Sequence, residues 1–244
     1  MRKSRANVEE ERFLASYRPS NYPRPAVTVD IVVLTIVDAD LKVLLVKRDE
    51  HPFKGRWALP GGFVRVGETA DNRGESLDEA AARELAEETG LQRGSAFLEQ
   101  LRAFGAADRD PRMRVISVAY WSLVRPTLVP LVHAGGDASH ARWYSLDEAR
   151  ALALAFDHEE ILDYAVARAR NEIDVSAIAF ELVPETFSIP ELRAVYEVVK
   201  GAPLDAGNFR KRVQRLLEAG ILEVAPGKRI TASKPAKVYR FKRN

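Results

Sequence analysis

The sequence predicts an α/β protein in two parts, an α/β/α sandwich followed by a winged helix-turn-helix. Segments rich in β-branched residues alternate with helical segments over the first two thirds of the 244 residues. The last third changes to a pattern of strand, helix, turn, helix and two strands around a basic loop. We therefore place an N-terminal arm at residues 1–25, the sandwich at 26–175 and the winged helix at 176–244.

The elements of the first part follow from local composition. Residues 1–25 are polar and contain three prolines, which predicts an arm with a short helix around residues 8–17. The helix predicted at 156–172 has Asp157 and Glu160 at the spacing of a capping box. A Gly- and His-containing loop is expected at 133–140, and a turn at 108–112. The other elements are predicted as strands at 26–37, 41–47, 97–104, 114–124 and 141–144, and a helix at 146–154.

A carboxylate cluster lies on the helix AAARELAEETGL, which Gly90 is expected to end. Glu84, Glu87 and Glu88 are spaced i, i+3 and i+4, so they share one helix face. Arg83 reaches Glu87 and offsets one of the three charges. Oxygen ligands without His or Cys suit a hard cation, Mg²⁺ or Mn²⁺, which often accompanies a phosphate substrate. The alternative is an ordinary solvated acidic face.

The residues around this helix resemble the Nudix box, whose pattern is G, five residues, E, seven residues, R-E-apolar-x-E-E-x-G-apolar. Both Glu68 and Glu75 fit its first Glu, because the chain has seven extra residues between the Gly turn and the helix. We assign the insertion to a polar loop at residues 69–75. The resemblance implies an α/β/α sandwich around a mixed sheet. It also implies that Glu87 and Glu88 hold Mg²⁺, that Glu84 binds metal or activates water, and that Arg83 orients the glutamates.

Charge and composition limit the classes of function. From Lys200 to Asn244 there are twelve Lys and Arg against three acids, a net charge of +9, which leaves −7 for the preceding residues. This asymmetry predicts an anionic partner for the tail. There is no cysteine, so disulfides and thiol chemistry are excluded. The basic N-terminus precedes no long apolar run, and we expect a cytoplasmic protein that has no membrane span.

The second part has clear helix-boundary signals. A strand is expected at 178–183, and Ser188 with Glu191 forms a capping-box spacing for a helix that runs to Lys200. Asp205 is expected to cap a second helix at 206–219. Two strands, at 221–224 and 237–241, enclose a basic loop at 226–234. This succession is typical of a winged helix-turn-helix, whose second helix enters the major groove.

The second helix divides into a buried stripe, which includes Phe209 and Val213, and a basic exposed face. Arg and Asn on such a face read base edges, and cations on the wing bind phosphates. The alternative is a basic helix and hairpin used for dimerisation. The candidate DNA-binding residues are Asn208, Arg210, Lys211, Arg212, Arg215, Lys228, Arg229 and Lys234.

The two parts together resemble the Nudix-related transcriptional regulators of NAD metabolism. The resemblance rests on the segments at 22–30, 52–64, 155–158 and 208–210. It implies a homodimeric repressor that binds operator DNA and senses ADP-ribose or a related NAD metabolite. The arm is expected to pack on the fold or on a partner subunit. The residues expected to bind the metabolite are Arg48, Trp57, Gly61, Gly62 and Arg112.

Three functions remain open from the sequence. The first is the repressor, with or without residual hydrolysis of ADP-ribose to AMP and ribose 5-phosphate. The second is a Mg²⁺-dependent Nudix hydrolase whose tail serves assembly. The third is an enzyme to which the basic domain delivers capped RNA. The charge of the tail argues against the second function, and a winged helix favours duplex DNA and thus the first.

Overall fold

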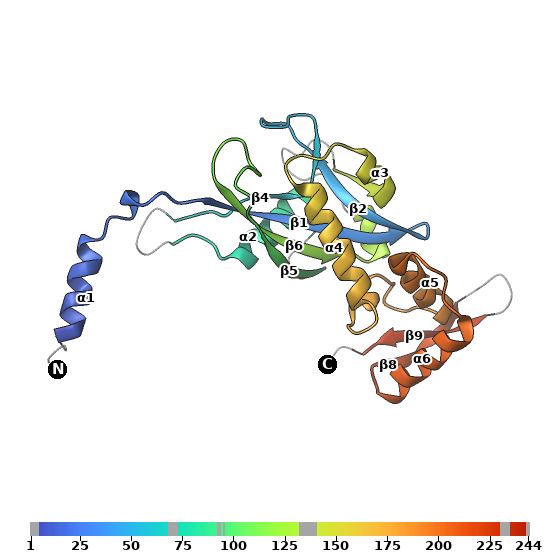
Figure 1. The fold of residues 1–244 in the computed structure, drawn as a ribbon. Coiled ribbons are helices and arrows are strands. Elements are labelled where there is room, and N and C mark those ends of the chain that lie inside the picture. The colour runs from blue at the N-terminus through green and yellow to red at the C-terminus, as the bar shows by residue number, and fades with distance from the viewer. Residues whose placement is uncertain are drawn as a thin grey trace.

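The computed structural model describes residues 5–67, 73–91, 94, 96–131, 141–229 and 235–242, and these have the predicted architecture (Figure 1). A seven-stranded mixed sheet has the order β3-β2-β1-β6-β5, with β4 paired to β1 and β7 paired to β2. β1 and β6 are parallel, and the other pairs are antiparallel. A small two-stranded sheet, β8-β9, belongs to the C-terminal part.

The elements of the first part lie close to their predicted bounds. The arm forms α1 and extends away from the sheet (Figure 1). Two 3₁₀ helices are present at Pro19–Asn21 and Pro126–Leu131. The strands and helices are α1 Arg5–Ser16, β1 Ala26–Val37, β2 Asp40–Lys47, β3 Trp57–Ala58, β4 Gly61–Phe63, α2 Leu77–Thr89, β5 Phe97–Phe104, β6 Val115–Leu123, β7 Ala141–Ser145, α3 Leu146–Ala151 and α4 His158–Glu172.

Helices α2 and α4 cover opposite faces of the sheet because successive side chains of β1 alternate between them. Val29, Ile31 and Val33 pack with α2, whereas Val32 and Leu34 pack with α4. The ends of α2 are set locally: Ser76 and Glu79 form a capping box, and Gly90 adopts the left-handed conformation, with φ 74°. These signals fix the acidic helix beside β4.

The C-terminal part has the expected helix pair and wing. Its elements are the 3₁₀ helix η3 Ile178–Glu181, α5 Ile189–Lys200, α6 Ala206–Glu218, β8 Leu222–Arg229 and β9 Ala236–Phe241. The predicted capping box of Ser188 and Glu191 is present. The Asp205 side chain accepts a hydrogen bond from Asn208 N at 2.8 Å, so it caps α6 as predicted.

Four local predictions were wrong. The predicted strand at 178–183 is replaced by η3 at Ile178–Glu181, because the chain joins the wing later, through the Phe187–Tyr239 bridge. Strand β8 continues to Arg229, through the start of the basic loop predicted at 226–234. Asp157 stands at the N-cap of α4 but makes no capping hydrogen bond, since its carboxylate binds Arg109. Helix α3 ends at Ala151, because Leu152 is extended. The loop expected at 133–140 lies outside the described residues.

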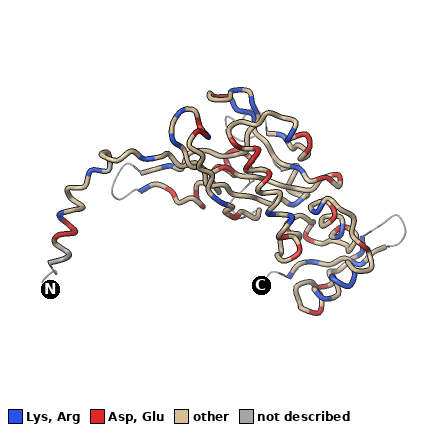
Figure 2. Tube along the Cα trace, in the orientation of Figure 1, with Lys and Arg blue, Asp and Glu red and all other residues tan. Residues whose placement is uncertain are grey.

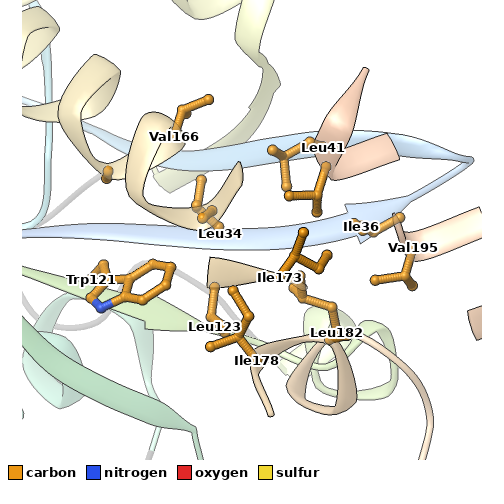
Figure 3. Close-up of a cluster of buried hydrophobic side chains, with 14 of the residues drawn as sticks. Leu34, Ile36, Leu41, Trp121, Leu123, Val166, Ile173, Ile178, Leu182 and Val195 are labelled. Atoms are coloured by element: carbon orange, nitrogen blue, oxygen red, sulfur yellow. The ribbon is translucent and has the colours of Figure 1, made fainter. Parts of the chain in front are cut away.

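A single apolar core joins the two parts (Figure 3). Leu34 and Leu123 of the sheet, Val166 of α4, Ile178 of η3 and Val195 of α5 belong to the same buried cluster. Close packing of this kind has low compressibility and transmits displacement. The winged helix therefore packs against the sandwich through a shared core. Of the described helices, none is long and apolar enough to cross a membrane.

Candidate functional site

The glycine turn lies directly against α2. Gly61 N donates to Glu88 Oε2 at 3.1 Å, and a Cβ on Gly61 would lie 2.2 Å from Val29 O. A Cβ on Gly62 would lie 2.3 Å from Glu84 Oε1. Gly61 thus requires glycine, because backbone atoms of β1 lie against it, whereas a side chain at Gly62 would displace the end of the Glu84 side chain.

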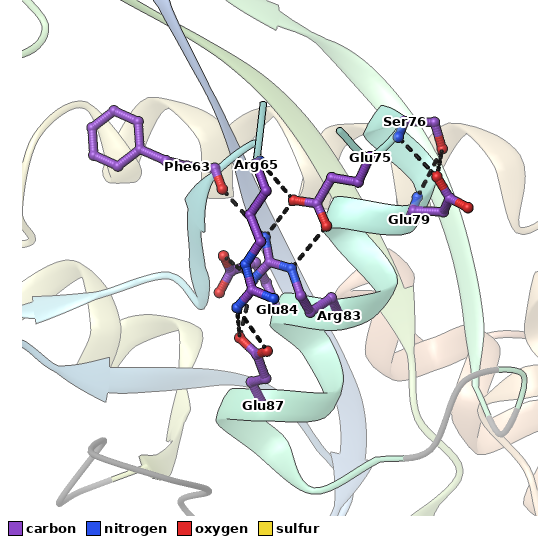
Figure 4. Close-up of polar contacts among 8 residues, drawn as sticks. All are labelled: Phe63, Arg65, Glu75, Ser76, Glu79, Arg83, Glu84 and Glu87. Atoms are coloured by element: carbon purple, nitrogen blue, oxygen red, sulfur yellow. Dashed lines mark hydrogen bonds and ion pairs between the residues drawn. The ribbon is translucent and has the colours of Figure 1, made fainter. Parts of the chain in front are cut away.

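Arg83 organises the polar contacts around the acidic helix (Figure 4). Its Nε and Nη2 donate to Glu75 at 2.9 and 2.6 Å, and its Nη1 donates to Glu84 at 2.7 Å and to Glu87 at 3.0 Å. The hydrogen bonds from Arg83 to Glu75, followed by the one that Arg65 N donates, lower the pKa of Glu75 to about 2. Glu75, one of the two glutamates that fit the first Glu of the box, is thus paired with the arginine of the same pattern, Arg83. Glu68 lies outside the described residues.

The structure divides the three predicted metal ligands. Glu87 is half exposed and pairs with Arg83 and with Arg65, at 3.0 and 3.1 Å. Glu88 turns toward the glycine turn, and burial, reinforced by the charge of Glu84, raises its pKa to about 8. Burial also raises the pKa of Glu84.

The donor set is suited to a hard cation, because two largely buried carboxylates that repel each other gain most from a positive charge between them. Among the described residues, no three acidic or histidine side chains already converge as a cation site. Glu84 and Glu88 supply the buried carboxylates for such an ion, and Glu84 Oε1 also accepts from Arg83 Nη1 at 2.7 Å. Glu87 would have to leave its arginine partners to join them.

A cavity of about 210 Å³ lies beside this helix, at one end of the sheet. Arg48 follows β2, and Arg112 comes from the β5–β6 loop; both line the cavity with Gly61 and Gly62. Arg48 lies 4.8 Å from the Phe156 ring, and Arg112 lies 5.4 Å from the Phe63 ring. A second cavity of about 190 Å³ shares Arg48 and Gly61 and reaches Glu88.

The cavity offers arginines and aromatic rings to a phosphate-containing ligand, and its charges are mixed, because Asp30, Glu50 and Asp110 line it as well. Burial, then the charge of Arg112, lowers the pKa of Arg48, and Asp110 holds Arg112 through two hydrogen bonds, at 3.0 and 2.8 Å. Arg suits bidentate contacts to phosphate. The Thr28 hydroxyl, which also lines the cavity, is buried and has no hydrogen-bond partner among the described residues. Trp57 does not line this cavity; its ring packs edge-on against Tyr144, with 5.0 Å between centroids.

A buried charge network forms the floor of the cavity, and its roles were not predicted from the sequence. Arg109 Nη2 donates to Asp30 Oδ2 at 3.2 Å and to Asp157 Oδ1 at 2.6 Å. His158 Nδ1 accepts from Leu59 N at 2.8 Å, so its proton is on Nε2, 3.4 Å from Asp30 Oδ1. Burial lowers the pKa of His158, which keeps the ring neutral. The signal for Asp30, Asp157 and His158 was the resemblance alone, at 22–30 and 155–158, and Arg109 lies outside both segments.

Figure 2 shows Lys and Arg along the helices and strands of the C-terminal part. Their side chains separate into those that are exposed and those that bind acidic or backbone partners. Phe209 and Val213 are buried as predicted. Arg212 binds Asp174, and Arg229 donates to Glu191 and to Thr186 O. Lys234 lies outside the described residues. The exposed candidates are Asn208, Arg210, Lys211, Arg215 and Lys228.

A larger cavity, about 660 Å³, lies along the side of α6 that carries Asn208 and Arg215. It is open, and Asp174 and Lys200 form part of its rim. Its arginines, Arg212 and Arg215, belong to the C-terminal part, and it shares no lining residue with the glycine turn or the acidic helix. We therefore take the smaller cavity as the candidate metabolite site.

Comparisons with known proteins agree with both parts of the chain. The family model described as NUDIX domain matches residues 26–165, and that described as NrtR DNA-binding winged helix domain matches residues 179–241. The ADPR responsive transcriptional repressor NtrR of Acinetobacter baylyi is 36% identical over 234 residues, which are 95% of this chain and 88% of that protein. The ADP-ribose pyrophosphatase of Methanocaldococcus jannaschii is 42% identical over 158 residues, 64% of this chain and 82% of that protein.

Solved structures give the same result. The crystal structure of Shewanella oneidensis NrtR complexed with a 27mer DNA has a TM-score of 0.73 and 34% identity, and the match covers 88% of this chain and 93% of that chain. The NUDIX domain of the same protein complexed with ADP ribose has a TM-score of 0.54 and 35% identity, covering 65% of this chain and 97% of that chain.

Proposed function

The chain belongs to the NrtR family, in which a Nudix domain precedes a DNA-binding winged helix domain, and we propose that it is an ADP-ribose-responsive repressor of NAD metabolism genes. One observation carries the proposal: the Nudix domain, which holds the arginine-lined pocket, and the basic winged helix share one continuous apolar core. Ligand in the pocket and DNA on the helix thus act on the same packed body.

The pocket chemistry supports ADP-ribose as the ligand. Its pyrophosphate would bind between Arg48 and Arg112, whose guanidinium groups both line the pocket, and would compete with Asp110 for Arg112. The rings of Phe63 and Phe156 offer apolar surface for the adenine, and the free Thr28 hydroxyl suits a ribose hydroxyl. Gly61 and Gly62 let the ligand approach the backbone and the acidic helix.

The C-terminal part supports duplex DNA as the second ligand. Arg210 and Lys211 lie in the exposed first half of α6, the part of a recognition helix that meets base edges. Lys228, on the wing, suits phosphate contact. A homodimer would place two such helices on a palindromic operator, one for each half-site. Such a regulator would work in the cytoplasm, where the chromosome is accessible.

Residual hydrolysis of ADP-ribose is a second candidate activity. It is favoured by the buried carboxylates of the acidic helix, Glu84 and Glu88, whose pKa values burial raises. Glu84 and Glu88, with Glu87 if it leaves its arginines, would hold Mg²⁺ or Mn²⁺. The ion would neutralise the pyrophosphate and supply an activated water when bound. Arg83 holds Glu75 and Glu84 in place and keeps the glutamate side chains oriented.

Fluorescence anisotropy on duplex DNA from the region upstream of the chain's own gene tests the proposal. Binding should be tighter to this duplex than to a scrambled one, and ADP-ribose should weaken it. AMP alone is the matched ligand control, because it lacks the pyrophosphate. Failure to bind duplex DNA, or equal binding with and without ADP-ribose, would contradict the proposed function. Release of AMP from ADP-ribose in Mg²⁺, absent in Glu88→Gln, tests the hydrolytic activity separately.

A further inference from the structure

Helix α4 connects the metabolite pocket to the predicted recognition helix. Its 15 residues span about 22 Å at 1.5 Å per residue. The first residue, His158, lines the pocket, and Asp174 follows the last turn. Along its length, Ile161, Leu162 and Ala165 are buried in the core shared by the two parts. Close packing of this kind transmits strain from one end of the helix toward the other.

The pocket end of α4 is held by charges. Asp157, immediately before the helix, accepts from Arg109 Nε at 2.9 Å and from Arg109 Nη2 at 2.6 Å. Arg109 shares the β5–β6 loop with Arg112, which lines the same pocket. A ligand that moves this loop therefore pulls directly on the start of α4.

The far end of α4 is held to the DNA-binding part through Asp174. Its Oδ1 lies 2.7 Å from Arg212 Nη1, its backbone oxygen accepts from Arg212 Nη2 at 2.6 Å, and its carboxylate also binds Lys200. The Arg212 guanidinium lies 4.6 Å from the centre of the Tyr196 ring, which packs edge-on against Phe209. Asp174 thus binds α6 near its middle, through Arg212, and α5 at its last residue, Lys200.

From these contacts we infer that Asp174 is the positioning residue through which occupancy of the pocket changes the orientation of the recognition helix. The inference rests on the proposed function and adds the route of the response. It requires that the protein have two conformations, which differ in the position of α4, and that ADP-ribose bind them with different affinities. Only such a difference in affinity shifts an equilibrium. Arg212, although basic and on α6, then transmits a displacement of Asp174 to α6.

The test compares Asp174→Asn with Asp163→Asn in the full chain. Asp163 pairs with Arg150 at 2.9 Å on the exposed side of α4, so its variant removes a similar ion pair that touches neither end. The readout is the coupling factor, which is the ratio of operator dissociation constants with and without saturating ADP-ribose. Allosteric coupling in proteins is typically about 5–150-fold. Calorimetry gives the ADP-ribose affinity of each free protein.

We expect wild-type coupling in Asp163→Asn and a factor below about twofold in Asp174→Asn, with ADP-ribose affinity unchanged within about twofold. Arg212→Gln should lose the same coupling, and the double variant should lose no more than either single one. Wild-type coupling in Asp174→Asn, additive losses, or loss of operator binding without ligand would overturn the inference. A wild-type chain whose operator binding ignores ADP-ribose would instead overturn the proposed function, and the inference with it.

Discussion

Replacing Glu88 by Gln should stabilise the metal-free protein at alkaline pH and change its stability little near pH 5. Burial, reinforced by the charge of Glu84, raises the pKa of Glu88 from 4.5 to about 8. A carboxyl group with a raised pKa in the folded state stabilises the fold fully below pH 4.5, and this contribution is lost as the pH rises through about 8. Gln has nearly the same shape and no charge, so the variant keeps its stability over this range.

The magnitude follows from the two pKa values. At about 1.4 kcal/mol per pH unit, the interval between 4.5 and about 8 corresponds to at most roughly 4–5 kcal/mol. Rotation of the carboxylate toward water lowers this limit, and we expect a gain in unfolding free energy of about 1–3 kcal/mol above pH 8.

Urea unfolding in EDTA at pH 5, 6.5, 8 and 9 measures this difference. Glu87→Gln is the matched control, since Glu87 is on the same helix but its side chain is 49% exposed and ion-paired. That variant should lose about 1 kcal/mol or less and gain nothing at alkaline pH. An unfolding free energy of Glu88→Gln that parallels the wild type at every pH would refute the reasoning. Added Mg²⁺ should raise the melting temperature of the wild type at pH 8 but not that of Glu88→Gln.

Three further predictions concern other parts of the chain. Gly62→Ala should displace the Glu84 carboxylate, since the new Cβ would lie 2.3 Å from its Oε1; Mg²⁺-dependent stabilisation should vanish in thermal melts while the fold remains. Arg210→Ala should cost roughly 1–3 kcal/mol on the operator and much less on scrambled DNA, whereas Lys228→Ala should weaken both duplexes alike and flatten the salt dependence; anisotropy with equal loss on both duplexes for Arg210→Ala would refute base reading there. Phe209→Ala should destabilise the protein by about 3–5 kcal/mol, because a buried ring is lost; calorimetry should show a single transition, and a Nudix transition that stays unchanged would contradict the shared core.

Local signals in the sequence were sufficient for most elements. The β-branched run at 26–37, the capping box at Ser188 and the left-handed Gly90 each depend on residues close in the chain. The family and the two-part fold also followed from motifs at fixed spacing. The prediction of a strand at 178–183 was wrong. The segment is apolar because it is buried between the two parts, and not because it pairs in a sheet.

The candidate site was predictable only in part, because its floor is assembled from distant segments. Asp30, Arg109 and Asp157 come from β1, a loop and the start of α4, and no spacing in the sequence relates them. The same distance explains why Asp157 was assigned to capping and Arg212 to DNA. In each case a tertiary partner, Arg109 or Asp174, binds the side chain that the local pattern assigned elsewhere.

The central claim, that one body couples ADP-ribose to operator DNA, is tested most directly by reciprocity. Calorimetry should measure ADP-ribose binding to the free protein and to its operator complex at one salt concentration. If ADP-ribose weakens operator binding by some factor, the operator must weaken ADP-ribose binding by the same factor, within the typical range of about 5–150-fold. Equal ADP-ribose affinity for the free protein and the complex would contradict the claim.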